Sequence, residues 1–575
     1  MKSYFSYFGI VLLTCLSCNT NPSAIEKQDY LKGELPVQEG MVLFNQHCSS
    51  CHNFSSNEIG PNLSGITSSV DKAWLKAFIQ NAQKMIAEGD PRAVAQFEKF
   101  GVFMPSFPQF SEDDLERLLG FIHKFSEGEK RNLSNRKGGL VNPIPQSIDE
   151  AEFTLVLEEF ATLPPSSEQA PVTRINTLRA LTTEKKERLF ISDLRGILYE
   201  IEGAEAQPYL AINTALDSFI DRPGLGSGLG SFAFHPDFEQ NGLLYTTHTE
   251  PPQTKPADFA TPEGAKATLQ WVLTEWETKT PTVTPFSGTH RELLRIDMIT
   301  GIHGCQELTF NPTAEPSSTE YGMLYLGIGD GGAALAGHPE ICGRKEYLWG
   351  SVIRIDPKGT NSTNGKYGIP PDNPFVGDAT GLPEIWSMGF RNPHRISWDS
   401  TGSRKMLVSN IGQHSVEEVN LVVKGGHYGW PFREGSFLFD VDANPEMVYS
   451  LPEEETPLFI NPVIEYDHDE GNAVSGGFVY GGKEIPALYQ KYLFGDIPRG
   501  TFFVSPLIEI RENHSASIQK VGIQIEGNYT SLQAVRPNER VDLRFGKGHR
   551  ETLYVFTKSN GKVYRVSDFK PKITE

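Results

Sequence analysis

Hydrophobic residues recur at helical spacing in the N-terminal part of the chain. Leu115, Leu118, Leu119 and Ile122 form one apolar stripe, and Ser111 with three acidic residues precedes them. Serine can cap the first turn of a helix, and acidic side chains suit the positive end of its dipole. The pattern therefore predicts a helix that begins after Ser111.

Beyond residue 146 the helical period fades, and short apolar runs recur, each followed by a small or acidic residue and a glycine turn. Clear examples begin at Leu189, Leu324, Leu407, Tyr492 and Leu553. Weak repetition over roughly 420 residues predicts an all-β six-bladed β-propeller with about 70 residues in each blade. A β-sandwich is less favoured, because it rarely repeats one strand–glycine–strand signature. The Pro/Thr-rich stretch 251–288 fits poorly and is expected to be an insertion near the rim.

Length and charge limit the possible classes of protein. The chain has 575 residues and a formal net charge of −20 at pH 7. This length exceeds a single core, so a multidomain protein is expected. The negative charge argues against nucleic-acid binding. No interior run is apolar and long enough to span a membrane.

The first residues predict export. An apolar run over 4–16 follows a basic residue and ends just before a serine and Cys18. This pattern is typical of a secretory signal. The small residue before Cys18 predicts a lipoprotein signal, with Cys18 acylated and retained as the mature N-terminus. Cys15 is an alternative acyl site, and ordinary signal cleavage is the other alternative. We expect a lipid-anchored protein in the periplasm or at the outer membrane.

Cys48, Cys51 and His52 form the pattern C-x-x-C-H, which is the attachment site of a c-type haem. The two thiols bond covalently to the porphyrin, and the histidine ligates the iron. In small c-type cytochromes a proline at the place of Pro61 fixes the imidazole through its carbonyl. Met104, which precedes a proline, is expected to supply the second iron ligand.

Two alternatives concern the methionine ligand. Met85 is a rival, but it lies in a Lys-rich helical run without a following proline, and Met104 could instead be a buried core residue. As a whole, residues 35–126 resemble a class I cytochrome c domain, which is small and all-α. The predicted order is a lipoprotein signal, a tether, the cytochrome c domain, a polar linker and the propeller, over residues 1–18, 19–34, 35–126, 127–150 and 151–575.

Two further cysteines, Cys305 and Cys342, lie outside the signal and the haem motif. In an oxidising compartment they could form a disulfide. They could equally be two separate buried thiols, and the sequence leaves both possibilities open.

Polar clusters interrupt the strand pattern and carry a family resemblance. An R-N-P at 391–393 is followed by G-x-x-x-x-E-E-V-N-L at 412–421 and G-G-x-Y-G-W-P at 425–431. Together with clusters at 228–238 and 303–310, these motifs resemble the PQQ-dependent glucose/sorbosone dehydrogenase family. Its members are six-bladed propellers that carry pyrroloquinoline quinone (PQQ) and calcium. The resemblance covers most of residues 160–570.

The resemblance implies oxidation of a sugar or polyol hydroxyl carbon to a carbonyl. By motif position, His303 corresponds to the base that removes the hydroxyl proton while hydride passes to PQQ, and an imidazole titrates near working pH. Arg391 corresponds to the cation over the quinone oxygens. Asn392 matches a neighbouring quinone contact, and Arg499 matches a cation for the PQQ carboxylates.

Calcium binding is also implied by the resemblance, and calcium prefers oxygen ligands. The carbonyls of Gly412 and Gln413 match the pair that holds the cofactor calcium. Glu418 and the carbonyl of Tyr428 match a second, structural calcium site.

Simpler structural roles compete with these assignments. His303 could cap a turn, and Glu418 could be a solvated acid. Arg391 could be the buried ion-pair partner of Glu384 or Asp399.

The chain also departs from the family pattern. Ile302 stands where glucose-oxidising members carry an acid, and the loop 466–470 is acidic where a lysine is usual. The stretch 472–482 looks more like the hedgehog-interacting-protein branch, whose members need not bind PQQ.

The two predicted domains fit one redox pathway. A reduced quinone must return two electrons, and a fused haem keeps an acceptor at high effective concentration. Met/His ligation raises the haem potential. We therefore expect electrons to pass from substrate to PQQ, to haem and to an external acceptor such as a cytochrome or a respiratory-chain component. One alternative is a non-catalytic, calcium-stabilised propeller that binds a glycan or a protein. The other is a calcium-dependent sugar lactonase, which would leave the haem without a role.

Overall fold

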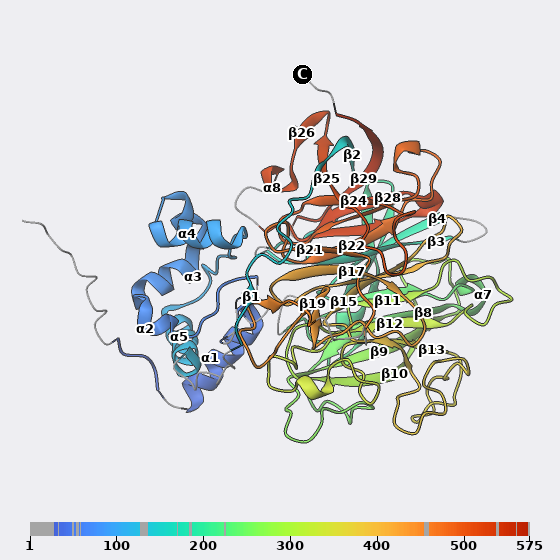
Figure 1. Ribbon diagram of the computed structural model, residues 1–575. Coiled ribbons are helices and arrows are strands. Elements are labelled where there is room, and N and C mark those ends of the chain that lie inside the picture. Colours follow the sequence, from blue (N-terminus) through green and yellow to red (C-terminus); the bar gives the residue numbers. More distant parts are fainter. Residues whose placement is uncertain are drawn as a thin grey trace, which may run out of the picture.

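The computed structural model describes residues 28–32, 34–48, 51–52, 54, 57, 59–126, 136–168, 171–182, 187–222, 226–452, 459–535, 540–558 and 560–572. A helical unit (residues 28–126) lies beside a larger β unit (residues 136–572), as Figure 1 shows. The predicted signal with Cys18, and most of the predicted tether, lie outside the described residues. Among the described helices, none has the length and apolar character needed to cross a membrane.

Five helices form the helical unit: α1 Glu34–His47, α2 Ile66–Ser69, α3 Lys72–Ala87, α4 Pro91–Phe100 and α5 Glu112–Ser126. The predicted helix after Ser111 is confirmed as α5, and its predicted apolar stripe is buried against α1. Ser111 caps it reciprocally, since its Oγ accepts from the backbone N–H of Asp114 (3.1 Å) and its own N–H donates to the Asp114 carboxylate (3.0 Å). The packed α1 and α5 hold Phe44 and Cys48 in one apolar core.

The β unit contains three sheets of four antiparallel strands in chain order, apart from one late strand. The first has β7 Ser231–Phe234, β8 Leu243–Glu250, β9 Leu269–Thr278 and β10 Gly288–Met298. The second has β11 Glu307–Phe310, β12 Leu324–Ile328, β13 Ser351–Ile355 and β14 Ile385–Met388. The third has β15 Pro393–Trp398, β16 Met406–Asn410, β17 Val416–Val422 and β21 Ile464–Asp467.

The remaining long strands join in one 13-stranded sheet, in the order β22-β23-β24-β25-β2-β29-β28-β27-β3-β4-β5-β6, with β26 beside β25. Its strands are β22 Val474–Val479, β23 Lys491–Asp496, β24 Phe502–Pro506, β25 Gln519–Ile525, β26 Asn528–Thr530, β2 Glu150–Thr162, β29 Lys562–Pro571, β28 Leu553–Thr557, β27 Leu543–Lys547, β3 Ile175–Thr182, β4 Glu187–Asp193, β5 Ile197–Glu202 and β6 Glu205–Ala211. Neighbours are antiparallel except at β2–β25 and β27–β3, which are parallel.

Short elements complete the β unit. A small sheet joins β1 Gly139–Leu140, β20 Val448–Tyr449, β19 Phe437–Leu438 and β18 Arg433–Glu434. The short helices are α6 Ile212–Ala215, α7 Phe238–Asn241, α8 Leu532–Val535, η1 Pro339–Ile341, η2 Pro486–Leu488 and η3 His549–Glu551.

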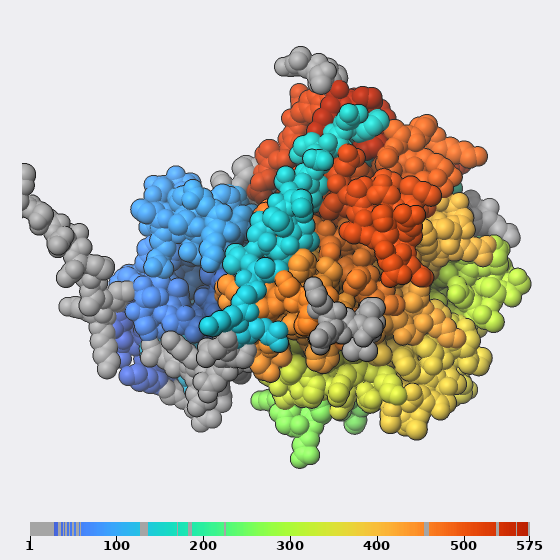
Figure 2. Space-filling model, viewed as in Figure 1, coloured from blue at the N-terminus to red at the C-terminus, as the bar shows by residue number. Residues whose placement is uncertain are grey.

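The two ends of the β unit pair with each other. Strand β2, near its start, runs antiparallel to the last strand β29, with Phe153 opposite Pro571 and Thr162 opposite Lys562. The described part of the predicted linker is held to the surface, since the Ile144 N–H donates to Asp467 (2.9 Å). Figure 2 shows this cyan stretch crossing the face of the β unit.

Six strands that begin the successive groups lie against one another in sequence. Strand β3 contacts β7, β7 contacts β11, β11 contacts β15, β15 contacts β22, β22 contacts β27, and β27 contacts β3. In antiparallel groups, the loop that enters the first strand and the loop that joins the second to the third lie at the same end. Loops far apart in the chain are thereby gathered at one end of the β unit.

The prediction that residues 251–288 form an insertion near the rim is wrong for the second half of this stretch. Residues Leu269–Thr278 form β9, an interior strand of its sheet, and Trp271 and Trp276 are buried. The prolines that flank this segment obscured a strand whose residues are nearly all buried, including Gln270 and Glu275, so that it lacks the alternation of buried and exposed residues that marks a half-exposed strand.

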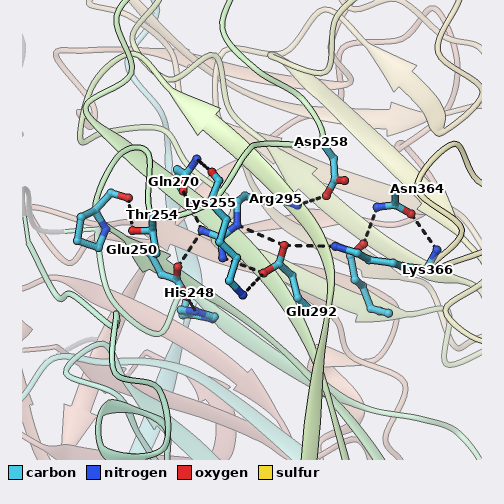
Figure 3. Close-up of polar contacts among 12 residues, drawn as sticks. His248, Glu250, Thr254, Lys255, Asp258, Gln270, Glu292, Arg295, Asn364 and Lys366 are labelled. Atoms are coloured by element: carbon cyan, nitrogen blue, oxygen red, sulfur yellow. Dashed lines mark hydrogen bonds and ion pairs between the residues drawn. The ribbon is translucent and has the colours of Figure 1, made fainter.

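A buried ion network joins three neighbouring strands, β8, β9 and β10 (Figure 3). The Arg295 side chain is 0% exposed, and its guanidinium donates to Glu250 (2.8 Å), Gln270 (2.8 Å) and Glu292 (2.8 Å). Burial alone would raise the pKa of Glu292, but hydrogen bonds from Arg295 and Lys255 lower it to about 2. This charge balance depends on Arg295.

Replacing Arg295 by alanine removes the cation and leaves its carboxylates buried. We expect Arg295→Ala to lower the free energy of unfolding by about 3–5 kcal/mol, measured from the urea midpoint. Lys279→Ala is the control, because Lys279 is 86% exposed and pairs with Glu277 at the surface; its cost should stay below about 1 kcal/mol. Equal shifts for the two variants would contradict this role of Arg295.

Candidate functional site

The haem motif begins where α1 ends. Helix α1 places Cys48 in the apolar core, and the backbone N–H groups of Cys51 (3.0 Å) and His52 (2.9 Å) donate to the Cys48 carbonyl. Nδ1 of His52 lies 2.9 Å from the carbonyl oxygen of Pro61, as the sequence predicts. Burial lowers the pKa of His52, and the Pro61 contact opposes this shift. A neutral imidazole with Nδ1 engaged presents Nε2 as a metal ligand.

Gly60 lies directly against this imidazole. A Cβ atom at residue 60 would come within 2.4 Å of Cε1 of His52, so only glycine fits this approach. Met104 is half-buried and packs against the core cluster that contains Cys48. The predicted haem residues therefore share one core, while the iron-ligand role of Met104 stays a prediction.

A cavity of about 120 Å³ lies at the end of the β unit where the loops gather. Five residues predicted from the sequence line it: His303, Arg391, Asn392, Gly412 and Gln413. They come from the β10–β11, β14–β15 and β16–β17 loops, so the strand order brings them together from distant parts of the chain. Ile59 of the helical unit lines the same cavity.

His303 is paired with a buried carboxylate. Its Nδ1 lies 2.7 Å from Oδ1 of Asp330, which also accepts from the Gly332 N–H (2.8 Å), while Oδ2 accepts from Trp430 Nε1 (3.0 Å). Although burial opposes it, the positive charges of His303 and Arg391 hold the pKa of Asp330 below its usual range. His303 has a positive φ of 50°, a strained conformation that clusters at functional sites. This geometry fits an oriented base better than a simple turn cap.

Arg391 is buried and held beside the loop that follows β16. Its Nε donates to Oε1 of Gln413 (2.9 Å), and its guanidinium carbon lies 5.9 Å from the ring centre of Trp430. No described ion pair joins it to Glu384, which accepts from Tyr367 (2.8 Å), or to Asp399. A cation held by neutral groups keeps its charge available to the cavity.

Sequence reasoning missed a group of basic side chains that line the same cavity. Arg540, Arg544 and Lys558 line the cavity around a single acid, Asp542. Burial, with the neighbouring cations, lowers the pKa of Arg544 to about 9 and that of Lys558 well below its usual value. The alternation over residues 540, 542 and 544 was a usable signal: the first two lead into β27, in which Arg544 lies, and every second residue of an extended chain shares one face.

The cavity also contains an imidazole without a partner. His394 lines the cavity and is buried, and neither of its ring nitrogens makes a hydrogen bond to the described residues. Buried polar atoms are normally paired, so such an atom at a cavity wall points to a missing ligand. The excess of positive charge on the walls indicates that this ligand is an anion.

Family models match both units of the chain. The model described as Glucose / Sorbosone dehydrogenase matches residues 172–502, and the model described as Cytochrome c matches residues 37–126. The chain belongs to the glucose/sorbosone dehydrogenase family. Its helical unit is a cytochrome c domain, which implies a haem at Cys48 and Cys51.

Curated relatives include both a quinoprotein dehydrogenase and proteins whose names state no oxidoreductase activity. HIPL1 protein from Arabidopsis thaliana is 28% identical over 310 residues, covering 47% of this chain and 42% of that protein. Human Hedgehog-interacting protein is 27% identical over 405 residues, covering 66% of this chain and 49% of that protein. Quinoprotein glucose dehydrogenase B from Acinetobacter calcoaceticus is 27% identical over 226 residues, covering 36% of this chain and 40% of that protein. The chain thus spans less than half the length of each of these three relatives.

Three predicted residues of this family member lie outside the cavity lining. Arg499 donates to the carbonyls of Asp469 (2.7 Å) and His468 (2.8 Å) and to Asn472 (2.9 Å), in the acidic loop. Tyr428 uses its hydroxyl to bond the Leu421 carbonyl (3.0 Å). Arg499 thus holds the loop around residues 468–472, and the Tyr428 side chain is bonded to the backbone of β17.

Glu418 is the third of these residues, and the solvated alternative for it is wrong. It is 3% exposed, and its Oε1 accepts from Asn410 (2.6 Å) and Asn420 (2.9 Å). Burial raises the pKa of Glu418 to about 7. In the described part of the chain no three acidic, histidine or cysteine side chains gather to hold a metal, so calcium there would depend on carbonyl oxygens.

The loop after β16 has the orientation that such a carbonyl site requires. Oε1 of Glu434 accepts from four successive backbone N–H groups, of residues 413–416, at 2.7–2.9 Å. The carbonyl and N–H of one trans peptide point in opposite directions. The carbonyls of Gly412 and Gln413 therefore point away from Glu434. Their residues line the cavity, which fits oxygen ligands for calcium at this wall.

Cys305 and Cys342 are both buried and free, so the disulfide alternative is not observed. Burial raises the pKa of both thiols. The two residues pack in the same apolar cluster as Trp271 and Trp349, where a neutral thiol acts as a small hydrophobic side chain.

Substituting Gly60 tests the haem-ligand geometry. Gly60→Ala forces a methyl group against His52, so we expect poor haem incorporation and an altered haem absorption spectrum. Gly65→Ala is the matched control, since no atom lies within 4 Å of its Cβ position and only its positive φ of 70° is strained. Normal haem spectra and yield in both variants would show that the close contact at Gly60 is not required.

Proposed function

We propose that this protein oxidises a sugar or polyol hydroxyl carbon to a carbonyl, with PQQ as hydride acceptor. Electrons then pass to the haem of the cytochrome c domain and to an external acceptor, such as another cytochrome or a respiratory-chain component. One observation carries the proposal: a single cavity is lined by His303, whose Nδ1 is paired with the buried Asp330, by a group of buried basic side chains and by Ile59 of the cytochrome c domain.

His303 is the proposed base. Asp330 holds the proton on Nδ1 of His303, which leaves Nε2 as the nitrogen that accepts the substrate hydroxyl proton. Asp330 also stabilises the imidazolium that results, because its carboxylate is held ionised by its neighbours. Arg391 would supply positive charge beside the quinone oxygens, where negative charge would develop on reduction.

The cavity fits PQQ through charge. PQQ, when bound, supplies the two-electron chemistry of a quinone. Its carboxylates require cations, and Arg540 and Arg544 provide them, with the Lys558 amine beside them, in place of the lysine that is missing from the loop 466–470. His394 offers an unpartnered ring nitrogen, and Asn392 a side-chain amide, at the same cavity. Arg499 supports this wall by fixing the loop around Asn472.

The proposal includes two calcium sites. The carbonyls of Gly412 and Gln413 would hold an ion beside the cofactor, and the reversed direction of these peptides relative to Glu434 supports this role. Glu418 and the Tyr428 carbonyl would hold a structural ion. Deprotonation of Glu418 would have to accompany binding there, because its pKa is raised.

Six blades are proposed for the β unit. The contacts that run from β3 through β7, β11, β15, β22 and β27 and return to β3 support a ring of six groups. Pairing of β2 with β29 supports closure of the last group by the first strand, a device that removes exposed edges.

Export and lipid anchoring complete the proposal. Attachment of a c-type haem takes place outside the cytoplasm in bacteria, which agrees with the signal pattern that ends at Cys18. We propose a location in the periplasm or at the outer membrane, with membrane contact only through the N-terminal lipid. The negative net charge of −20 supports the absence of nucleic-acid partners.

A non-catalytic binding role is the second candidate. One of the relatives, human Hedgehog-interacting protein, carries a name that concerns binding of another protein, and the name of HIPL1 protein states no oxidation. The acidic loop that replaces the expected lysine, with Arg499 directed to its carbonyls, favours this candidate. The His303–Asp330 pair in a cationic cavity favours the enzyme.

Variants of the His–Asp pair separate the two candidates. With PQQ and calcium added, we expect oxidation of at least one aldose or polyol to reduce an artificial dye. His303→Ala should abolish this turnover, and Asp330→Asn should lower kcat about 100-fold or more with little change in KM. His338→Ala and Glu340→Gln are matched controls, because this His–carboxylate pair (3.2 Å) lies outside the cavity lining.

Full activity in Asp330→Asn would contradict the proposed base. Binding of PQQ without turnover of any sugar by the unaltered protein would favour the binding candidate.

A further inference from the structure

The haem-bearing loop of the cytochrome c domain touches the β unit at the cavity. Ile59 lies between the haem motif and Gly60, and it is one of the residues that line the cavity. Two residues earlier, the backbone N–H of Asn57 donates to Oε1 of Glu446 in the β unit (3.0 Å). The loop is therefore bound beside the cavity by a charge-assisted hydrogen bond.

Arg540 connects the cavity with the haem attachment site. Its Nε pairs with Asp542 (2.8 Å) inside the cavity wall, and its Nη1 lies 3.7 Å from Sγ of Cys51. That sulfur atom is one of the two that carry the porphyrin. The Arg540 side chain thus reaches from the cavity lining to a sulfur of the haem attachment site, and it is only 13% exposed.

Two further interactions link the cytochrome c domain to the β unit. Gly101, which follows α4, lies against Arg499, the residue that donates to the carbonyls of the acidic loop, so that a Cβ there would come within 3.3 Å of its Nε. His47, which ends α1, is reached by the charge of Arg222, and burial together with this charge lowers its pKa to about 4. These interactions join the helical unit to the β unit at points other than the cavity lining itself.

We propose that the described part of the haem-bearing loop, held at Asn57 and reaching the cavity at Ile59, is a fixed wall of the substrate cavity, and that Ile59 is a specificity-determining residue supplied by the cytochrome c domain. The loop would receive electrons without domain movement, with Arg540 as the side chain between cavity and haem. Each substrate gives up two electrons and two protons. The haem iron carries one electron at a time, so it is reduced and reoxidised twice for each substrate, and the external acceptor takes both electrons.

The specificity role of Ile59 rests on the proposed function, whereas the docking of the loop can be tested without substrate. In haem-loaded protein without PQQ, we expect hydrogen exchange at the Asn57 amide to be slow. Glu446→Ala removes its acceptor and should speed exchange about tenfold. Glu315→Ala is the control, because this exposed acid pairs with Arg404 (3.0 Å) away from the loop. Equal exchange at Asn57 in all three proteins would overturn the docking.

Kinetics test the coupling. With PQQ and sugar, Glu446→Ala should slow haem reduction several-fold relative to dye reduction, since the dye does not need the loop. An unchanged ratio of the two rates would overturn the inference. Complete absence of dye reduction in the unaltered protein would refute the proposed function and leave the exchange result standing.

Ile59→Ala tests the specificity role. Shortening this wall should lower KM for a disaccharide relative to a monosaccharide, by about fivefold or more for the loss of three side-chain carbons. Ile86→Ala is the control, because Ile86 is also half-buried in the cytochrome c domain but does not line the cavity. The same substrate preference in both variants would overturn this role of Ile59.

Discussion

The hydrogen bond between His303 and Asp330 is the interaction on which the site depends. Asp330 accepts from His303 on one oxygen and from Trp430 on the other, while its own N–H donates to the Arg391 carbonyl at 2.8 Å. The Asp330 carboxylate thus sets the tautomer of the proposed base, and the backbone N–H of the same residue anchors the loop that carries Arg391. Because Trp430 lies beneath the Arg391 guanidinium, movement of Asp330 would disturb both catalytic groups.

Local motifs made much of this site predictable from the sequence. Cys48, Cys51 and His52 lie within five positions of one another, and His303, Arg391, Asn392 and the Gly412–Gln413 pair stand in loops whose motifs resemble the family, and the structure brings these loop residues together in one cavity. The helix after Ser111 was predictable because capping and apolar spacing are local signals. The strand at Leu269–Thr278 was missed because a fully buried strand lacks polar alternation.

Long-range contacts explain what the sequence did not reveal. Arg540, Arg544 and Lys558 lie near the C-terminus and reach the cavity only because β27 returns beside β3. Ile59 reaches it only through docking of the second unit. The loop 466–470 has no lysine, but basic side chains from another part of the chain line the same cavity. Charge at a site is set by all the elements around it, so a single aligned position is a weak guide to cofactor affinity.

The central claim is that substrate electrons reach the haem through a cofactor in this cavity. The direct measurement mixes oxidised, calcium-loaded full-length protein and PQQ with a panel of aldoses and polyols, and follows the c-type α-band. The account predicts haem reduction that requires both PQQ and a sugar and that does not depend on protein concentration. A haem that stays oxidised with every sugar, although PQQ is bound, would contradict it.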